Sequence, residues 1–170
     1  MPTLLAGEIP KQFVQKRALE IRKKYFQHSK SPQDAFNDIF NDLNGTIEYV
    51  KTNKKRETLC INSDCSFTIY LPLSSSGMRD NFTIAHELGH FFLHTECAGK
   101  EKLVFNRGAS NRKEWEANWF AAELLMPEKE FKEAAKKLCY DEYELGLHFG
   151  VSSSAAAVRL SSLNLKTNVF

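Results

Sequence analysis

Two histidines four residues apart constrain this chain more than any other feature. They belong to the pattern His86-Glu87-x-x-His90, inside the largely apolar stretch 83–94. On one helix, residues with this spacing lie on neighbouring turns of the same face, so both imidazoles can reach one Zn²⁺. Glu87 projects roughly 100° round the helix, where it can reach a metal-bound water rather than the metal. The short pattern also arises by chance, so its surroundings decide what it means.

The helix that carries the pattern is apolar on its far side. At about 100° per residue, the arc opposite the two histidines holds Ile84, Ala85, Leu88, Phe91 and Phe92. That arc can be buried while the histidines face elsewhere. Two histidines and a carboxylate on such a helix are costly to bury without a ligand. We therefore favour a zinc site over a pair of structural core histidines.

Length and composition indicate one globular domain. The 170 residues suffice to bury a core, and 42% hydrophobic and 26% charged residues are ordinary proportions. A net charge of +2 predicts no strong attraction to nucleic acid or to anionic membranes. The first residues do not resemble a signal peptide and no apolar run could cross a bilayer, so we expect a cytoplasmic protein. No Cys-x-x-Cys pair occurs among the cysteines, which argues against a second, thiolate-bound zinc at Cys60, Cys65, Cys97 or Cys139.

The apolar pattern predicts helices at both ends of the chain and strands between them. Helices are expected at residues 11–30, 32–43, 113–126, 127–138 and 141–150, with a last one capped by Ser152. Strands are expected at residues 46–50, 58–61 and 66–71. Short connections between these strands favour an antiparallel or mixed sheet. Asp80 is the expected N-cap of the metal helix, and residues 95–112 are expected to form a loop.

A catalytic zinc needs three protein ligands and one open position. His94 lies four residues after His90, but residues so spaced drift about 40° round the helix, and one straight helix cannot wrap round an ion. We therefore expect His94 to pack beside the site or to support it. The helix expected at residues 113–126 offers two better candidates, Glu114 and Glu116.

A helical wheel separates these two glutamates. Glu114 shares its side with Ala117, Asn118 and Ala121, whereas Glu116 lies with bulky aromatic residues. A helix that supplies a ligand must approach the metal helix closely, which favours its small-residue face. We therefore favour Glu114 over Glu116, with Asn118 placed to orient a ligand by a hydrogen bond. The simpler alternative is that both glutamates are solvated.

Together these segments resemble the ImmA/IrrE family of bacterial zinc peptidases. The resemblance rests on residues 79–94 and 114–127 and extends over about residues 45–165. Residues 1–44 contain no motif of the family. The resemblance implies an α+β, zincin-like (gluzincin-like) single domain. Together with the predicted strands, we expect a small three-stranded sheet packed on the active-site helix and a helical C-terminal part. Within that domain we expect a helical N-terminal segment, 1–44, a zincin core with the metal site, 45–127, and a C-terminal helical subdomain, 128–170.

The resemblance also implies a site and an activity. The family's zinc ligands map onto His86, His90 and Glu114, and its general base maps onto Glu87. Members are similar in cleaving helix-turn-helix repressors of mobile elements or stress regulons. A bacterial or phage zinc endopeptidase that relieves repression is therefore the expected function. The oxyanion stabiliser stays open between Arg79, Tyr140, Tyr143 and His148.

Two alternatives come from other functional classes. Residues 145–152 and the alanine-rich helix after them resemble the spacing of a DNA-binding helix-turn-helix. Arg159 is the only basic residue of the would-be recognition helix before Lys166, so we expect these helices to pack on the protein and to bind DNA weakly. The other alternative is a zinc-holding regulator that binds a repressor without cutting it. In the peptidase reading, we expect the substrate to lie along the strand 67–71 as an edge strand.

Overall fold

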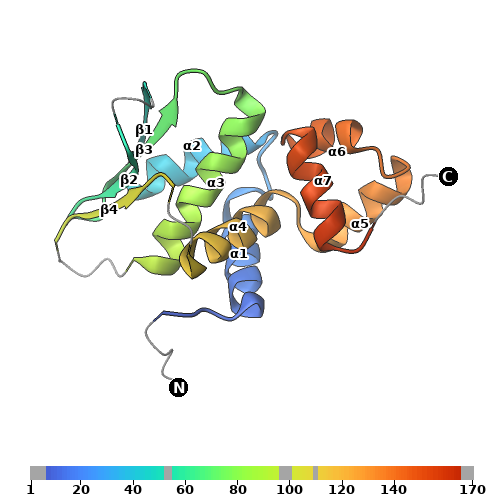
Figure 1. Cartoon of the computed structure of the whole chain (residues 1–170), viewed down its shortest axis with the longest axis horizontal. Coiled ribbons are helices and arrows are strands. Elements are labelled where there is room, and N and C mark those ends of the chain that lie inside the picture. Colours follow the sequence, from blue (N-terminus) through green and yellow to red (C-terminus); the bar gives the residue numbers. More distant parts are fainter. Residues whose placement is uncertain (1–6, 52–54, 96–100, 109–110, 166–170) are drawn as a thin grey trace.

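The computed structural model describes residues 7–51, 55–95, 101–108 and 111–165. Helices and strands follow along the described residues in the order α1 (Lys11–Tyr25), α2 (Pro32–Leu43), β1 (Gly45–Val50), β2 (Glu57–Ile61), β3 (Phe67–Pro72), α3 (Gly77–His94), β4 (Leu103–Asn106), α4 (Arg112–Leu125), α5 (Glu128–Lys137), α6 (Glu142–Phe149) and α7 (Ser153–Ser162). In Figure 1 the sheet lies at one end of the molecule, α5 to α7 lie at the other, and α3 and α4 run between them.

The sheet is mixed and has the strand order β1-β3-β2-β4. Strand β3 pairs parallel with β1 and antiparallel with β2, and β2 pairs antiparallel with β4. The α+β class and the mixed sheet are therefore as predicted. The expectation of three strands is wrong, because β4 lies inside residues 95–112, where a loop is expected from the sequence. A four-residue strand carries too little alternation to be recognised.

Strand β3 lies between two other strands, so the expectation that a substrate pairs with it is wrong. Its backbone is occupied on one side by β1, with Gly45 opposite Phe67, and on the other by β2, with Leu59 opposite Ile69. The alternation along this strand reflects a buried face. Alternation does not indicate whether a strand lies at the edge or in the centre of a sheet, because that depends on pairing.

The sheet is joined to the metal helix through one aromatic side chain of β3. The ring of Phe67 lies 5.9 Å from that of Phe40 in α2 and 4.6 Å from that of Phe91 in α3, measured between centroids. Phe67 is fully buried between the two helices. A side chain on Gly45 would collide with the Phe67 ring and would lie 2.8 Å from Phe40. Asn44 makes the turn before it in the left-handed conformation, with φ 54°.

Side-chain caps set the ends of the helices. Ser31, Asp141 and Ser152 accept hydrogen bonds from the first turns of α2, α6 and α7, and Ser152 is the cap that the sequence predicted. The metal helix differs, because Ser76 is its N-cap and accepts from the Arg79 N–H. Asp80 was expected to cap it and instead lies buried inside the first turn. Residues 74–77 are three serines and a glycine, all of which can cap a helix, so the sequence did not show where the first turn begins.

Helix α4 is contacted from both ends of the chain. Helix α1 packs along it, and Arg22 donates to the Leu124 carbonyl over 2.6 Å. From α7, Arg159 donates to Glu123 over 2.6 Å and to the Met126 carbonyl over 3.0 Å. The side chains of Arg159 and Glu123 are each only 5% exposed, so this is a buried ion pair. The helix that carries Glu114 is therefore held from two sides.

Two further expectations concern membrane-spanning helices and the cysteines. Among the described helices, none is long and apolar enough to cross a membrane. Cys60, Cys65 and Cys139 are free thiols, and Cys97 lies outside the described residues.

Candidate metal centre

Helices α3 and α4 approach each other backbone to backbone at Gly89. A Cβ atom on Gly89 would lie 3.0 Å from the Cα and 3.1 Å from the carbonyl oxygen of Ala117, and 3.2 Å from the Cβ of Phe120. Ala117 belongs to the small-residue face of α4 that the helical wheel identified. The close approach brings the first turn of α4 next to the histidines of α3.

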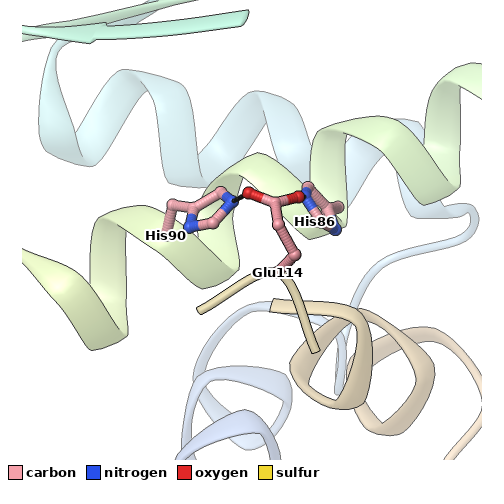
Figure 2. Close-up of side chains that lie close together, drawn as sticks. All are labelled: His86, His90 and Glu114. Atoms are coloured by element: carbon pink, nitrogen blue, oxygen red, sulfur yellow. Dashed lines mark hydrogen bonds and ion pairs between the residues drawn. The ribbon is translucent and has the colours of Figure 1, made fainter. Parts of the chain in front are cut away.

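The structure brings together His86, His90 and Glu114. The Glu114 carboxylate lies between the two imidazole rings (Figure 2), with 3.0 Å from Oε2 to the His86 Nε2 and 3.0 Å from Oε1 to the His90 Nε2. One ligand atom from each residue lies within 4.8 Å of the other two. The wheel argument therefore chose the carboxylate that meets the histidines.

These three residues fit a zinc ion. Two histidines and a glutamate are the donor set of many catalytic zinc sites, with ligand atoms about 2.0–2.2 Å from the metal. The observed spacing lets one ion reach all three after small side-chain adjustments. The His90 side chain is 2% exposed, whereas those of His86 and Glu114 are 16% and 24% exposed. The site is thus closed behind His90 and open to solvent at His86 and Glu114.

The protonation states of His90 and Glu114 also favour a cation, whereas that of His86 depends on its contact with Glu114. Burial, together with the nearby His86, lowers the pKa of His90 to about 3, so its imidazole is neutral. The hydrogen bond from His86 holds the pKa of Glu114 below its usual value despite burial. Burial alone would lower the pKa of His86, but the hydrogen bond with Glu114 and the nearby carboxylates raise it overall. Neutral imidazole and ionised carboxylate are the forms that ligate a metal.

Glu87 is a buried carboxylate with an unused oxygen. It is 3% exposed, and its Oε2 has no hydrogen-bond partner among the described residues. Burial raises the pKa of Glu87 to about 7, against the opposing effects of His86, the Thr58 hydroxyl and Arg107. A buried oxygen without a partner is costly. A water held at the metal position would supply the missing donor.

His86 and His90 each contact a further side chain through the ring nitrogen that faces away from Glu114. For His86 this is Asn118, whose Oδ1 lies 2.8 Å from Nδ1, as expected from its place on α4. For His90 it is His94, with 2.9 Å between the two Nδ1 atoms. Hydrogen bonds of this kind fix ring orientation in metal sites. His94 therefore lies behind His90 and is not part of the group of residues that could hold a metal, as expected.

Glu116 is neither a member of the ligand group nor solvated. Its side chain is 0% exposed, and its Oε2 lies 2.8 Å from the Nε2 of His94. The alternative that both glutamates are solvated is wrong for this residue. The wheel placed Glu116 away from Glu114 but could not show that its partners include Ile9, far away in the sequence.

In the described part of the chain, none of the four oxyanion candidates forms a hydrogen bond with a side chain of the candidate metal site. Tyr143 and His148 lie on α6, Tyr140 lies just before it, and Arg79 is exposed in the first turn of α3. Arg107, which follows β4, lies near enough to Glu87 to lower its pKa and was not considered from the sequence. Nothing in the sequence pattern indicated that Arg107 lies near Glu87, because β4 itself was not predicted.

Strand β4 borders the site through Phe105. Its ring stacks on that of His90 at 4.6 Å between centroids, and it lies 6.5 Å from the ring of His94. Strand β4 is the last strand of the sheet beyond β2. The edge of the sheet nearest the candidate metal position is therefore β4.

A mixed sheet beside two facing helices that supply two histidines and a glutamate is the architecture of a metallopeptidase. The chain belongs to the peptidase family described as the IrrE N-terminal-like domain, which it matches over residues 41–161. It is also similar to the metallopeptidase ImmA of Bacillus subtilis (strain 168), with 30% identity over 91 residues. These residues are 53% of this chain and 54% of that protein, so the chain spans about half the length of the curated relative it matches. The family predicted from the motifs is confirmed.

Proposed function

We propose that the chain is a zinc-dependent endopeptidase, with His86, His90 and Glu114 as zinc ligands and Glu87 as the general base. The observation that carries the proposal is the convergence of three ligand atoms within 4.8 Å, beside a buried carboxylate with an unpaired oxygen. Zinc bound there would lower the pKa of a bound water and polarise the scissile carbonyl. Membership of a peptidase family supports the same activity.

Glu87 carries the proton in this proposal. Its unpaired Oε2 takes a proton from the attacking water and then delivers it to the leaving amine. A carboxylate can accept a proton from a water whose pKa the zinc would lower, and the resulting carboxyl group can donate that proton to the leaving amine. The exposed guanidinium of Arg107 joins the earlier candidates for stabilising the developing negative charge.

The peptide is proposed to pair with β4. Its backbone is bonded to β2 on one side only among the described strands, and Phe105 places it beside His90. Leu103 and Val104 are 40% and 44% exposed, so apolar side chains border this edge. Addition of an extended peptide to a free sheet edge provides affinity through backbone hydrogen bonds and needs little sequence preference.

For the substrate we propose a helix-turn-helix transcriptional repressor in the cytoplasm of a bacterium or phage-infected cell, whose cleavage relieves repression. The support is the resemblance to the ImmA/IrrE family. A DNA-binding role through α6 and α7 is not favoured, because Arg159 is buried in an ion pair with Glu123 and cannot reach a base edge.

The deciding experiment compares the zinc-loaded wild type with Glu87→Gln on a candidate repressor. Wild type should cleave it at one site, whereas Glu87→Gln should retain zinc and fold but show no cleavage, because only the proton carrier is lost. Full cleavage by Glu87→Gln would refute the mechanism. Tight repressor binding by both proteins, without cleavage by either, would instead establish the non-cleaving regulator.

A further inference from the structure

A chain of buried contacts runs from His90 away from the metal position. The His90 Nδ1 lies 2.9 Å from the His94 Nδ1, and the His94 Nε2 lies 2.8 Å from Oε2 of Glu116. The side chains of His90, His94 and Glu116 are 2%, 3% and 0% exposed. Water therefore does not compete for the hydrogen bonds between these three side chains.

The outer end of this chain is held by two N–H donors. Oε1 of Glu116 accepts from the Ile9 backbone N–H over 2.7 Å and from the Arg112 Nε over 3.0 Å. Arg112 also donates to the Ile9 carbonyl over 3.0 Å. The donors at Oε1 are a backbone N–H and a guanidinium, which is the bonding of an ionised carboxylate. Such a carboxylate can only accept hydrogen bonds.

The positions of the ring protons follow from that acceptor. Because Glu116 only accepts, the His94 Nε2 must carry a proton and donate it. The two Nδ1 atoms lie 2.9 Å apart, so one of them carries a proton and the other accepts it. His90 can bind a metal through Nε2 only when its own proton is on Nδ1, so the His90 Nδ1 donates to the His94 Nδ1. The lone pair of the His90 Nε2 then faces the metal position, and the Glu114 side chain, which is 24% exposed, can accept from water instead.

We propose that Glu116 and His94 are positioning residues that fix the tautomer and orientation of His90 for metal binding. The inference rests on the proposed metal site. It gives the N-terminal segment a part in the site, because Ile9 and Arg112 orient the Glu116 carboxylate. Ile9 lies outside the residues that match the family, so this end of the relay belongs to the chain's own N-terminal segment.

Glu116→Gln tests the relay with almost no change in volume. The two N–H donors at Oε1 should draw the amide oxygen of Gln to their side, which turns the NH₂ group toward the His94 Nε2. His94 must then carry its proton on Nδ1, and His90 must carry its own on Nε2, where it blocks the metal. Changes to residues that support metal ligands typically cost about 10–100-fold in metal affinity, and we expect a loss of zinc affinity in that range.

Glu123→Gln is the matched control. Glu123 is an equally buried carboxylate of the same helix, paired with Arg159 and not with the relay. Both substitutions should lower thermal stability. Glu123→Gln should leave zinc affinity within about twofold of wild type, because the loss of its ion pair with Arg159 does not change the tautomer of His90.

Substitutions of His94 provide a rescue test. His94→Asn places a carboxamide oxygen as many bonds from the backbone as the imidazole Nδ1, so it can still accept from His90. It should retain zinc affinity within a few-fold, whereas His94→Leu should lose about 10–100-fold. In the His94→Asn background, Glu116→Gln should cause no further loss, because the link between the two residues is already cut.

Zinc affinity is measured by competition with a chromophoric chelator, and ring tautomers by long-range ¹H–¹⁵N spectra. In the metal-free wild type, His94 should be protonated on Nε2, and in Glu116→Gln on Nδ1. Equal zinc affinity for Glu116→Gln and Glu123→Gln, or a wild-type His94 protonated on Nδ1, would overturn the relay. If the wild type bound no zinc, the proposed function would fail, while the His94 spectrum would still decide the relay.

Discussion

Gly89→Ala tests whether the close approach of α3 and α4 builds the metal site. The added Cβ would meet the Cα and carbonyl oxygen of Ala117 at 3.0 and 3.1 Å and the Cβ of Phe120 at 3.2 Å. Ala117 and Phe120 are fully buried, and none of these atoms is the end of a flexible side chain. The helices must therefore separate by a few tenths of an ångström.

Two opposing terms set the effect on stability. Alanine is favoured over glycine inside a helix by about 1 kcal/mol. Overpacking of a well-packed contact costs about 1–3 kcal/mol. The net loss of about 0–2 kcal/mol corresponds to a fall in Tm of about 2–4 °C per kcal/mol in a chain of this size.

The effect on the metal should be larger than the effect on the fold. Ligand distances in metal sites hold within about 0.2 Å, so moving Glu114 away from the histidines by more than that strains the site. We expect zinc affinity to fall by about tenfold or more, which corresponds to about 1.4 kcal/mol.

The assay is a chelator competition for zinc, beside thermal denaturation of the metal-free protein. Gly77→Ala is the matched control, because a Cβ there meets nothing within 4 Å at the start of the same helix. It should raise stability by up to about 1 kcal/mol and leave zinc affinity unchanged. A Gly89→Ala protein with a raised Tm and the zinc affinity of wild type would refute the reasoning.

The remaining predictions concern the ligands and the buried ion pair. His86→Ala, His90→Ala and Glu114→Ala should each lose most of the bound zinc, as measured by metal analysis after gel filtration; retention of one zinc per chain by any of them would remove that residue from the ligand set. Arg159→Ala should cost about 3–5 kcal/mol in denaturant unfolding, because it leaves the Glu123 charge buried without its partner. Restoration of most of that loss by Glu123→Leu in the same chain would confirm the cause, and a loss below about 1 kcal/mol would contradict it.

The sequence predicted those parts of the site that follow from local periodicity. Both histidines lie on one helix face, and the small-residue face of α4 selected Glu114 over Glu116, so helical geometry alone sufficed. The partners of Glu116 could not be predicted, because Ile9 reaches it from a distant segment whose position depends on the packing of α1. The same limit explains the error at β3, since strand order depends on long-range pairing.

The strand order also has a consequence for the order of folding. Strands β2 and β3 form the one pairing between strands adjacent in the described sequence, with Ile61 opposite Phe67 across a short turn. Strand β1 pairs with β3 although β2 lies between them in the sequence. Strand β4 pairs with β2 although β3 and the whole of α3 lie between them in the sequence. Closing short loops costs least entropy, so the β2–β3 hairpin should form first and β4 last. Strand β4 is then also the element most easily opened from the native state, as suits a strand proposed to receive and release a peptide.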